Sequence, residues 1–308
     1  MASVKSLIVI AGPTASGKTE LAIKVARQLH TEVISADSRQ FYREMSIGTA
    51  KPSPQELEIV PHHFINSLSI TDDYTAGDFE REGLRVLDAI FRHNSYAVLA
   101  GGSGLFIKAI TEGFDELPGP SSDLRKNLNT VFSEQGLLPL QQQLKELDPE
   151  YFHQVDLNNP KRVIRALEVC LATGKPFSAL RHSSKKVRNF KCIKIGLDIH
   201  REALYERINQ RVDQMVKNGL FEEAESLFNY RHLNALNTVG YAEIFTYMEG
   251  KTTREEAINA IKQNTRRYAK RQLTWFRKDP DIKWFSPAQA GEIIEYIMSG
   301  TTRPARTE

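Results

Sequence analysis

Short apolar runs alternate with segments of helical periodicity in the first third of the chain. Residues 7–11 form a continuous apolar run, and apolar positions recur at helical spacing over residues 21–29. Residues 32–36 are typical of a second short strand, and residues 96–100 of a buried one that follows a helical pattern over residues 79–91. Strands that alternate with helices predict an α/β fold with a parallel sheet covered on both faces.

The pattern changes near residue 113. Residues 113–120 are rich in glycine and proline, and the apolar spacing from there to Phe190 predicts helices without a convincing strand. Residues 192–199 alternate like a strand and return the chain to the sheet. We therefore expect residues 113–190 to form a helical insertion domain.

The predicted core consists of residues 1–112 and 191–308. Beyond residue 201 the pattern is helical, and it ends in a last short strand at residues 282–285.

A glycine-rich turn joins the first apolar run to the first helix. It consists of Gly12, Pro13, Thr14, Ala15, Ser16, Gly17, Lys18 and Thr19. Between a strand and a helix, this pattern is typical of a phosphate-binding loop, where backbone N–H groups and the helix N-terminus bind an anion. Lys18 adds a mobile positive charge, and Thr19 can hold Mg²⁺ through its hydroxyl. The loop predicts a diphosphate site without identifying ATP as the ligand.

Two further loops follow predicted strands, at the sheet edge where open α/β folds bind ligands. They are residues 37–40 and 101–104. Asp37 is a candidate general base or indirect Mg²⁺ ligand, or else it caps a turn. Ser103 is a candidate to hydrogen-bond a phosphate or an incoming nucleophile, or else it is an ordinary turn serine.

The clearest charge feature is residues 262–278, which contain seven basic residues and no acidic one. On a helix Arg266 lies one turn from Lys270, and Arg267 one turn from Arg271. Tyr268, Trp275 and Phe276 are interleaved with them. A solvated basic face is the alternative, but the absence of acids favours a polyanion site.

A second basic cluster begins a predicted helix inside the insertion. It comprises Lys161, Arg162 and Arg165. Together with the first cluster it suggests a nucleic acid held from two sides.

Arg207 and Arg211 lie four residues apart on one predicted helix. They are placed either to reach a diphosphate opposite the phosphate loop or to pair with Glu202 and Glu206.

Composition adds few constraints. The net charge of +3 is too small to indicate nucleic-acid binding by itself. Two cysteines cannot form a disulfide framework, and the eight histidines lack zinc-type spacing, so we expect structural or surface histidines and a reducing cytoplasm. No apolar run is long enough to span a membrane, and we expect no membrane partner.

Motifs in family order over nearly the whole chain resemble the tRNA dimethylallyltransferase family, also called tRNA isopentenyltransferases. The matching stretches are residues 12–19, 35–40, 47–52, 101–105, 207–208, 211–213, 239–241 and 265–276. The resemblance implies a P-loop, nucleoside-kinase-like core that transfers a dimethylallyl group from dimethylallyl diphosphate to an adenosine. The acceptor would be N6 of the adenosine 3′-adjacent to the anticodon, in tRNAs reading codons that begin with U.

The same resemblance assigns roles to residues. Asp37 would take the N6 proton, while Lys18, Thr19 and Mg²⁺ stabilise the departing diphosphate with help from Arg211. Ser103 stands where the family usually has threonine, and it keeps the hydroxyl. The tRNA anticodon stem-loop would be held by Asp37, Ser38, Arg39, Gln40, Ser103, Arg125, Lys161, Arg162, Arg165, Arg266, Arg267, Lys270 and Arg271. We expect a monomer.

Three alternatives remain at this point. A P-loop small-molecule kinase explains the phosphate loop but not the basic segments, and an adenylate isopentenyltransferase also needs no polynucleotide grip. A non-catalytic RNA-binding protein leaves the phosphate loop and Asp37 unused.

Overall fold

Six parallel strands form one sheet with the order β3-β2-β4-β1-β5-β6. The computed structural model describes residues 4–115, 117, 119, 122–181 and 185–302. The strands are β1 (Ser6–Ala11), β2 (Val33–Ser35), β3 (His62–His63), β4 (Tyr96–Gly101), β5 (Lys191–Leu197) and β6 (Lys283–Phe285). The predicted parallel sheet is confirmed, and β1 lies between β4 and β5 because Ile8 aligns with Val98 on one side and Ile193 on the other.

The helices of the core lie before and after the insertion. Before it come α1 (Lys18–Gln28), α2 (Pro54–Ile59), α3 (Ala76–His93) and α4 (Gly104–Thr111). After it come α10 (Arg201–Lys217), α11 (Leu220–Ser226), α12 (Tyr241–Met248), α13 (Arg254–Phe276) and α14 (Ala290–Thr302), with 3₁₀ turns at Phe228–Tyr230, Asn234–Leu236 and Pro287–Gln289. The expectation that the chain ends its regular structure at a strand was wrong, because α14 follows β6.

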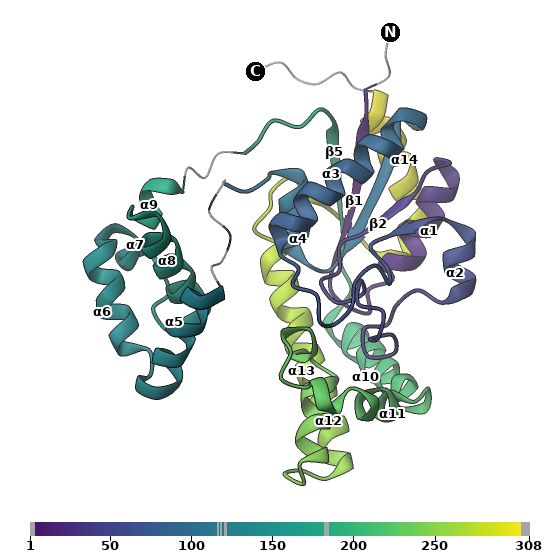
Figure 1. The fold of residues 1–308 in the computed structure, drawn as a ribbon. Coiled ribbons are helices and arrows are strands. Elements are labelled where there is room, and N and C mark those ends of the chain that lie inside the picture. The colour runs from purple at the N-terminus through teal and green to yellow at the C-terminus, as the bar shows by residue number, and fades with distance from the viewer. Residues whose placement is uncertain (1–3, 116, 118, 120–121, 182–184, 303–308) are drawn as a thin grey trace. The chain divides into compact units, whose positions relative to one another are not determined.

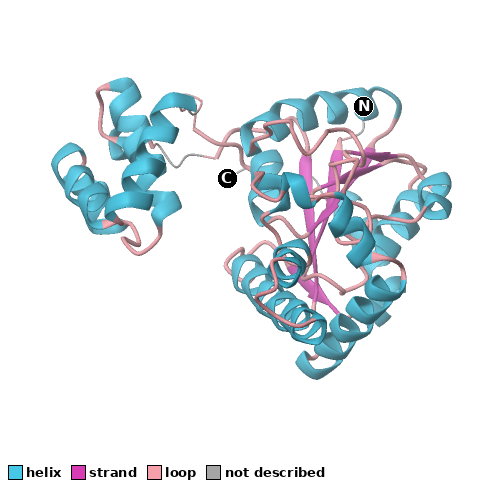
Figure 2. Cartoon of the chain, turned by 60° about the horizontal axis from the view of Figure 1, so that its bottom comes forward, coloured by secondary structure: helices cyan, strands magenta, loops and turns pink. Residues whose placement is uncertain are grey.

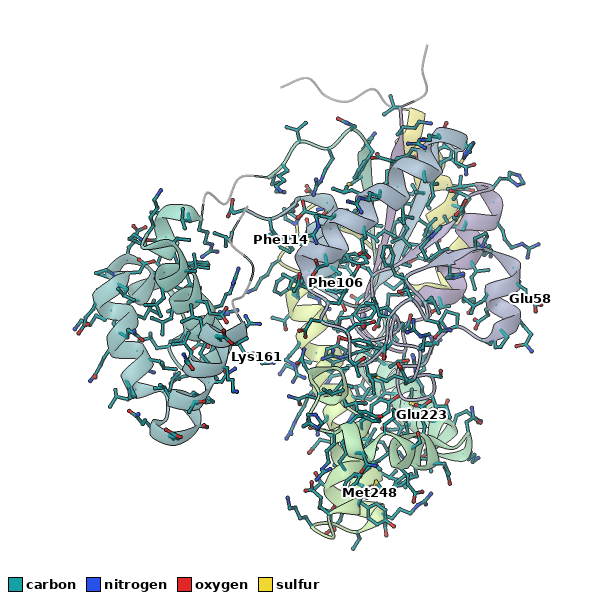
Figure 3. The ribbon with its side chains drawn as sticks, in the orientation of Figure 1. Glu58, Phe106, Phe114, Lys161, Glu223 and Met248 are labelled. Atoms are coloured by element: carbon teal, nitrogen blue, oxygen red, sulfur yellow. The ribbon has the colours of Figure 1, made fainter. Side chains whose placement is uncertain are left out.

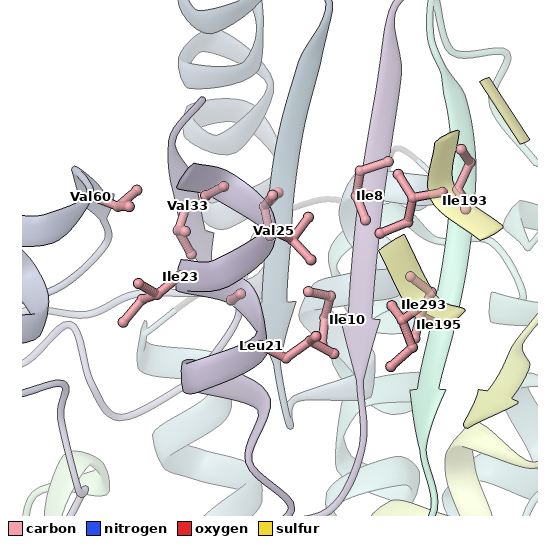
Figure 4. Close-up of a cluster of buried hydrophobic side chains, with 14 of the residues drawn as sticks. Ile8, Ile10, Leu21, Ile23, Val25, Val33, Val60, Ile193, Ile195 and Ile293 are labelled. Atoms are coloured by element: carbon pink, nitrogen blue, oxygen red, sulfur yellow. The ribbon is translucent and has the colours of Figure 1, made fainter. Parts of the chain in front are cut away.

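Helices α1 and α14 pack on the same face of the sheet. Ile8 and Ile10 of β1 meet Val25 of α1 in a cluster that also contains Ile293 and Ile297 of α14 (Figure 4). Alternate residues of a strand point to opposite faces, so Leu7 and Val9 face the other side.

The opposite face is covered by α3 and α4, and helices therefore enclose the sheet on both sides (Figure 2). Thr75 and Asp78 form a capping box at the start of α3. Phe79 of α3 stacks on Phe106 of α4 with ring centroids 4.4 Å apart.

Helices α10 to α13 lie beyond the carboxyl ends of the strands (Figure 1). Helix α13 packs on both α10 and α12, and it also contacts α4. This places the carboxyl-terminal basic segment next to the loops that leave the sheet.

Residues 113–187 form a separate compact unit. Its helices are α5 (Ser122–Gln135), α6 (Leu138–Leu147), α7 (Pro149–Gln154), α8 (Pro160–Thr173) and α9 (Phe177–Leu180). They enclose a core of their own around Leu140, Leu144 and Leu167. The glycine- and proline-rich segment 113–120 lies only partly within the described residues.

Residues 188–190, expected in the insertion, belong to the α/β unit. Arg188 fixes this boundary, because its guanidinium donates to the carbonyls of Ala109 and Ile110 at 2.7 and 2.9 Å and pairs with Glu80 at 2.9 Å.

Candidate active site

A cavity of about 100 Å³ opens at the carboxyl edge of the sheet, beside β2, β4 and the loop that follows β1. Residues from all three predicted loops and from two distant helices line it. The lining residues are Thr14, Lys18, Thr19, Ala22, Val33, Ser35, Asp37, Gln40, Thr49, Ala50, Pro52, His62, Ala100, Gly101, Gly102, Arg211, Tyr268 and Gln272.

The phosphate loop has the backbone that its glycines predict. Gly12 and Gly17 have φ angles of 155° and 88°, which side chains other than glycine rarely adopt. A Cβ on Gly12 would also lie 3.2 Å from the carbonyl oxygen of Leu197. Gly17 directly precedes α1, so the N-terminus of this helix faces the cavity that contains Lys18 and Thr19.

Lys18 lies between a cation and an anion. Its ammonium donates to the carbonyl oxygen of Pro13 at 2.6 Å. Burial, together with the nearby Arg211 guanidinium, lowers the pKa of Lys18 to about 7, and the Asp37 carboxylate opposes this shift. Burial also lowers the pKa of Arg211, again against the influence of Asp37. A bound diphosphate would supply the negative charge that these two cations lack.

Asp37 both caps its turn and lines the cavity. Its Oδ1 accepts hydrogen bonds from the backbone N–H groups of Arg39 and Gln40, at 2.9 and 3.3 Å. The turn-capping alternative for Asp37 is therefore confirmed, and the carboxylate also lines the cavity, where the general base predicted from the sequence would have to lie. Ser38 and Arg39 are not among the described residues that line it.

Ser103 joins two loops and is not part of the cavity lining. Its Oγ accepts the backbone N–H of Ser38 at 3.0 Å, and its own N–H donates to the carbonyl of Ala36 at 3.1 Å. It also hydrogen-bonds the side chain of Tyr268, whose pKa burial raises to about 12, helped by Asp37. The serine hydroxyl thus fixes the loop that carries Asp37.

Helix α13 packs directly against the glycine loop that follows β4. A Cβ on Gly101 would lie 2.1 Å from the carbonyl oxygen of Ala36, and one on Gly104 would lie 2.1 Å from Nε1 of Trp275. A Cβ on Gly102 would lie 2.2 Å from Nε2 of Gln272. The glycines are therefore required for close approach rather than for unusual backbone angles.

The side chains of Arg207 and Arg211 line two different cavities. Arg211 lines the phosphate-loop cavity, whereas Arg207 lines a second cavity of about 920 Å³ between α10, α13 and β6. In the described part of the chain, neither arginine forms an ion pair with Glu202 or Glu206. Glu202 pairs with His200, and Glu206 accepts a hydrogen bond from Gln210.

Acidic residues from other elements pair with part of the basic segment 262–278. Lys262 pairs with Asp213 at 2.7 Å and Arg277 with Asp198 at 3.4 Å. Arg266 donates to the side-chain oxygen of Asn209 at 2.7 Å, so the row of Arg266 and Lys270 is partly used within the fold. Among the basic residues from Arg266 to Arg271, the exposed ones are Arg267, Lys270 and Arg271.

In the insertion, a buried glutamate holds two of the basic candidates. Arg125 and Arg165 both pair with Glu168, which is 2% exposed. Lys161 and Arg162 are exposed at the start of α8 (Figure 3).

Sequence reasoning missed three parts of the site. Gln272 lines the cavity and joins its walls, yet in the sequence it is only a neutral residue within a basic segment. His62 also lines the cavity, and its Nδ1 lies 2.7 Å from the carbonyl oxygen of Val60. Thr49, Ala50 and Pro52 form another wall of the cavity. The only signal for them in the sequence was that they lie in residues 47–52, one of the stretches that resemble the family.

Oxygen atoms dominate the groups that a metal ion could use here. Among the described residues, no group of three or more His, Cys, Asp or Glu side chains is placed to hold a metal. The Thr19 hydroxyl and Asp37 carboxylate in the cavity are hard oxygen donors, which suit Mg²⁺ bound mainly by phosphate oxygens and water. Within the described part of the chain, no helix has the length and apolar character to cross a membrane.

Relatives of known identity match the chain almost from end to end. One from Christiangramia forsetii, named tRNA dimethylallyltransferase, is 56% identical over 294 residues, or 95% of this chain and 97% of the relative. Another, tRNA dimethylallyltransferase 1 from Bacteroides thetaiotaomicron, is 48% identical over 95% of both chains.

Solved structures agree with these sequence matches. The tRNA isopentenylpyrophosphate transferase from Bacillus halodurans has a TM-score of 0.72 and 37% identity over 96% of this chain and 97% of that one. A eukaryotic dimethylallyltransferase acting on tRNA has a TM-score of 0.80 and 27% identity over 99% of this chain and 81% of that one. The sequence model described as IPP transferase matches residues 40–279. The chain therefore belongs to the IPP transferase family, the tRNA dimethylallyltransferases.

Proposed function

We propose that the chain transfers a dimethylallyl group from dimethylallyl diphosphate to N6 of the adenosine 3′-adjacent to the anticodon, in tRNAs reading U-starting codons. One observation carries the proposal: the Asp37 carboxylate lines the same cavity as the cations Lys18 and Arg211. A proton acceptor and an anion site thus lie together, as the transfer of an allylic group to an amine requires.

The phosphate loop binds the diphosphate in this proposal. Backbone N–H groups at the start of α1 hold its oxygens, and Lys18 turns from the Pro13 carbonyl toward the anion. Arg211 faces the same charge from α10. The C1–O bond breaks, the N6 lone pair forms the new C1–N bond, and diphosphate leaves as an anion. Neutralising that leaving group is the main task of these cations.

Asp37 accepts the N6 proton. Its Oδ1 is fixed by two backbone N–H groups, which orient the carboxylate in the cavity. Positioned carboxylates of this kind accelerate proton transfer by about 10² to 10⁴. Ser103 and Tyr268 act on this step by holding the Asp37 loop.

Mg²⁺ fits the oxygen donors of the cavity. Thr19 would hold it through the hydroxyl, with the diphosphate and water completing its coordination. When bound, it supplies positive charge against the departing diphosphate.

The acceptor is a tRNA held by exposed basic side chains. Arg267, Lys270 and Arg271 on α13 and Lys161 and Arg162 on α8 are the groups that support phosphate binding. A base inside an anticodon loop must turn outward to reach a cavity of this size, at a cost of a few kcal/mol. We propose that the protein acts as a monomer.

The test compares donors on one acceptor. Unmodified tRNA is incubated with the protein, Mg²⁺ and either prenyl-labelled dimethylallyl diphosphate or γ-labelled ATP. The proposal expects label in the tRNA only from dimethylallyl diphosphate, with one diphosphate released for each group transferred. Label from ATP, or prenyl transfer to free AMP but not to tRNA, would contradict it.

A further inference from the structure

The carboxylate of Glu223, on α11, accepts hydrogen bonds from a loop that is distant in the sequence. Its Oε2 accepts the backbone N–H groups of Ser46 and Ile47 at 2.9 and 2.8 Å, and its Oε1 accepts that of Gly48 at 2.9 Å. Three consecutive N–H groups form an anion-binding concavity, which here contains a carboxylate of the same chain. Figure 3 shows Glu223 where the α10–α11 helices meet the loops beyond the sheet.

Tyr241, the first residue of α12, completes this arrangement. Its hydroxyl donates to Oε1 of Glu223 at 2.6 Å, and its ring is fully buried. The ring lies so close to the loop that a Cβ on Gly48 would lie 2.5 Å from it. The Glu223 carboxylate therefore receives four hydrogen bonds, and charge-assisted bonds of this kind are about twice as strong as neutral ones.

The loop so held continues into the wall of the active-site cavity. Immediately after Gly48, Thr49, Ala50 and Pro52 line that cavity. Gln40 holds the same wall from the other side, donating to the carbonyl of Ala50 at 3.1 Å. Residues 46–52 are thus fixed between the Asp37 loop and helix α11.

This wall belongs to the less polar part of the cavity. Lys18 and Arg211 provide the cationic groups, whereas the apolar lining residues are Ala22, Val33, Ala50, Pro52 and Ala100. An allylic diphosphate has the same division, an anionic head and a hydrocarbon chain. With its head at the phosphate loop, its chain is expected to lie against apolar residues such as Ala50 and Pro52.

We propose that Glu223, together with Tyr241, is a positioning residue for the prenyl donor, fixing the wall formed by residues 46–52 and thereby selecting a short prenyl chain. The proposal rests on the function proposed above. Glu223 touches neither the cavity nor the reacting atoms, and it acts only through the loop.

Glu223→Gln tests this with little change in shape. Glutamine carries no negative charge, so its side-chain oxygen accepts weaker hydrogen bonds. Its NH₂ group is itself a donor and cannot bond the N–H groups that it would face. The KM for dimethylallyl diphosphate should rise about tenfold, with kcat within about twofold and the Kd for tRNA unchanged. The preference for dimethylallyl over geranyl diphosphate should fall by a similar factor.

Tyr241→Phe keeps the ring against Gly48 and removes one donor, so the donor KM should rise about threefold. Glu225→Gln, on the exposed side of α11, is the matched control and should leave every constant unchanged. If Glu223→Gln lowers only the melting temperature, or lowers kcat and kcat/KM equally, the proposal is overturned.

Hydrogen exchange separates this proposal from the proposed function. The amides of Ser46, Ile47 and Gly48 should exchange slowly in the unaltered protein and faster in Glu223→Gln, whatever the enzyme transfers. Unchanged exchange would overturn the proposal. If the unaltered protein transfers no prenyl group to tRNA, the proposed function fails, and with it the role in donor selection, even where exchange shows that Glu223 holds the loop.

Discussion

The side-chain amide of Gln272 donates to the carbonyl oxygen of Gly102 at 2.9 Å. Its oxygen accepts the backbone N–H of Thr14, also at 2.9 Å. One buried side chain on α13 therefore connects the phosphate loop to the glycine loop after β4. The helix that carries the exposed basic residues is thus fixed to the loop that binds the diphosphate in our proposal.

Gln272→Met should weaken both the fold and the site. It leaves the Thr14 N–H and the Gly102 carbonyl without this partner, which costs about 1–3 kcal/mol when such groups are buried. We expect a lower free energy of unfolding in urea and a lower kcat/KM for the donor. Gln263→Met, exposed on the same helix, is the control. Equal stability of the two variants would argue against the bridge.

Lys18→Met should abolish transfer and stabilise the protein without ligand. The pKa of Lys18 is about 7 in the fold and about 10.4 in an unfolded chain. Between these values the unfolded state binds more protons, so the stability of the unaltered protein rises with pH across this window. Below pH 7 Lys18 is protonated in both the folded and the unfolded state, so the folded protein bears the full free-energy cost of burying this charge.

The melting temperature of Lys18→Met should therefore exceed that of the unaltered protein most at pH 6, and the difference should shrink toward pH 10. Thermal melts over this pH range measure it, with Lys24→Met on the exposed side of α1 as the control. A constant difference across the range would mean that Lys18 does not titrate there.

Asp37→Asn should lower kcat by about 10² to 10⁴ while leaving the tRNA Kd nearly unchanged. Asparagine keeps an oxygen that accepts the N–H groups of Arg39 and Gln40, so the turn should survive. Single-turnover kinetics and filter binding measure the two quantities. Loss of tRNA binding in this variant would assign Asp37 a structural role instead.

Arg267→Ala combined with Arg271→Ala should weaken tRNA binding and flatten its salt dependence. Both side chains are exposed, and each phosphate that is no longer neutralised lowers the slope of log K against log salt by about 1. Titrations at several salt concentrations give the slope. Lys262→Ala, which removes a cation already paired with Asp213, is the control. An unchanged slope in the double variant would place the tRNA elsewhere.

The elements that sequence reasoning found are those with a local signal. The continuous apolar runs of β1 and β4 and the phosphate loop each lie within a few residues of chain. Helix α14 was missed although it had such a signal: Ile293 and Ile297 lie one turn apart, and both are buried in the core.

The other parts that were not found depend on contacts between distant residues. Gln272 bonds Thr14 across 258 positions, and Glu223 bonds Ile47 across 176. The ion pairs of the acid-free segment 262–278 were not found for the same reason, since Asp213 and Asp198 pair with two of its cations from elsewhere in the fold. No periodicity or spacing within one segment contains this information.

The most direct measurement follows the prenyl group to its acceptor atom. Two tRNAs that differ only in carrying adenosine or guanosine 3′ of the anticodon are incubated with the protein, Mg²⁺ and labelled dimethylallyl diphosphate, then digested to nucleosides. We predict that label appears only from the adenosine tRNA, as an N6-prenylated adenosine, and that Asp37→Asn suppresses it. Equal label from both tRNAs, or label in neither, would contradict the account.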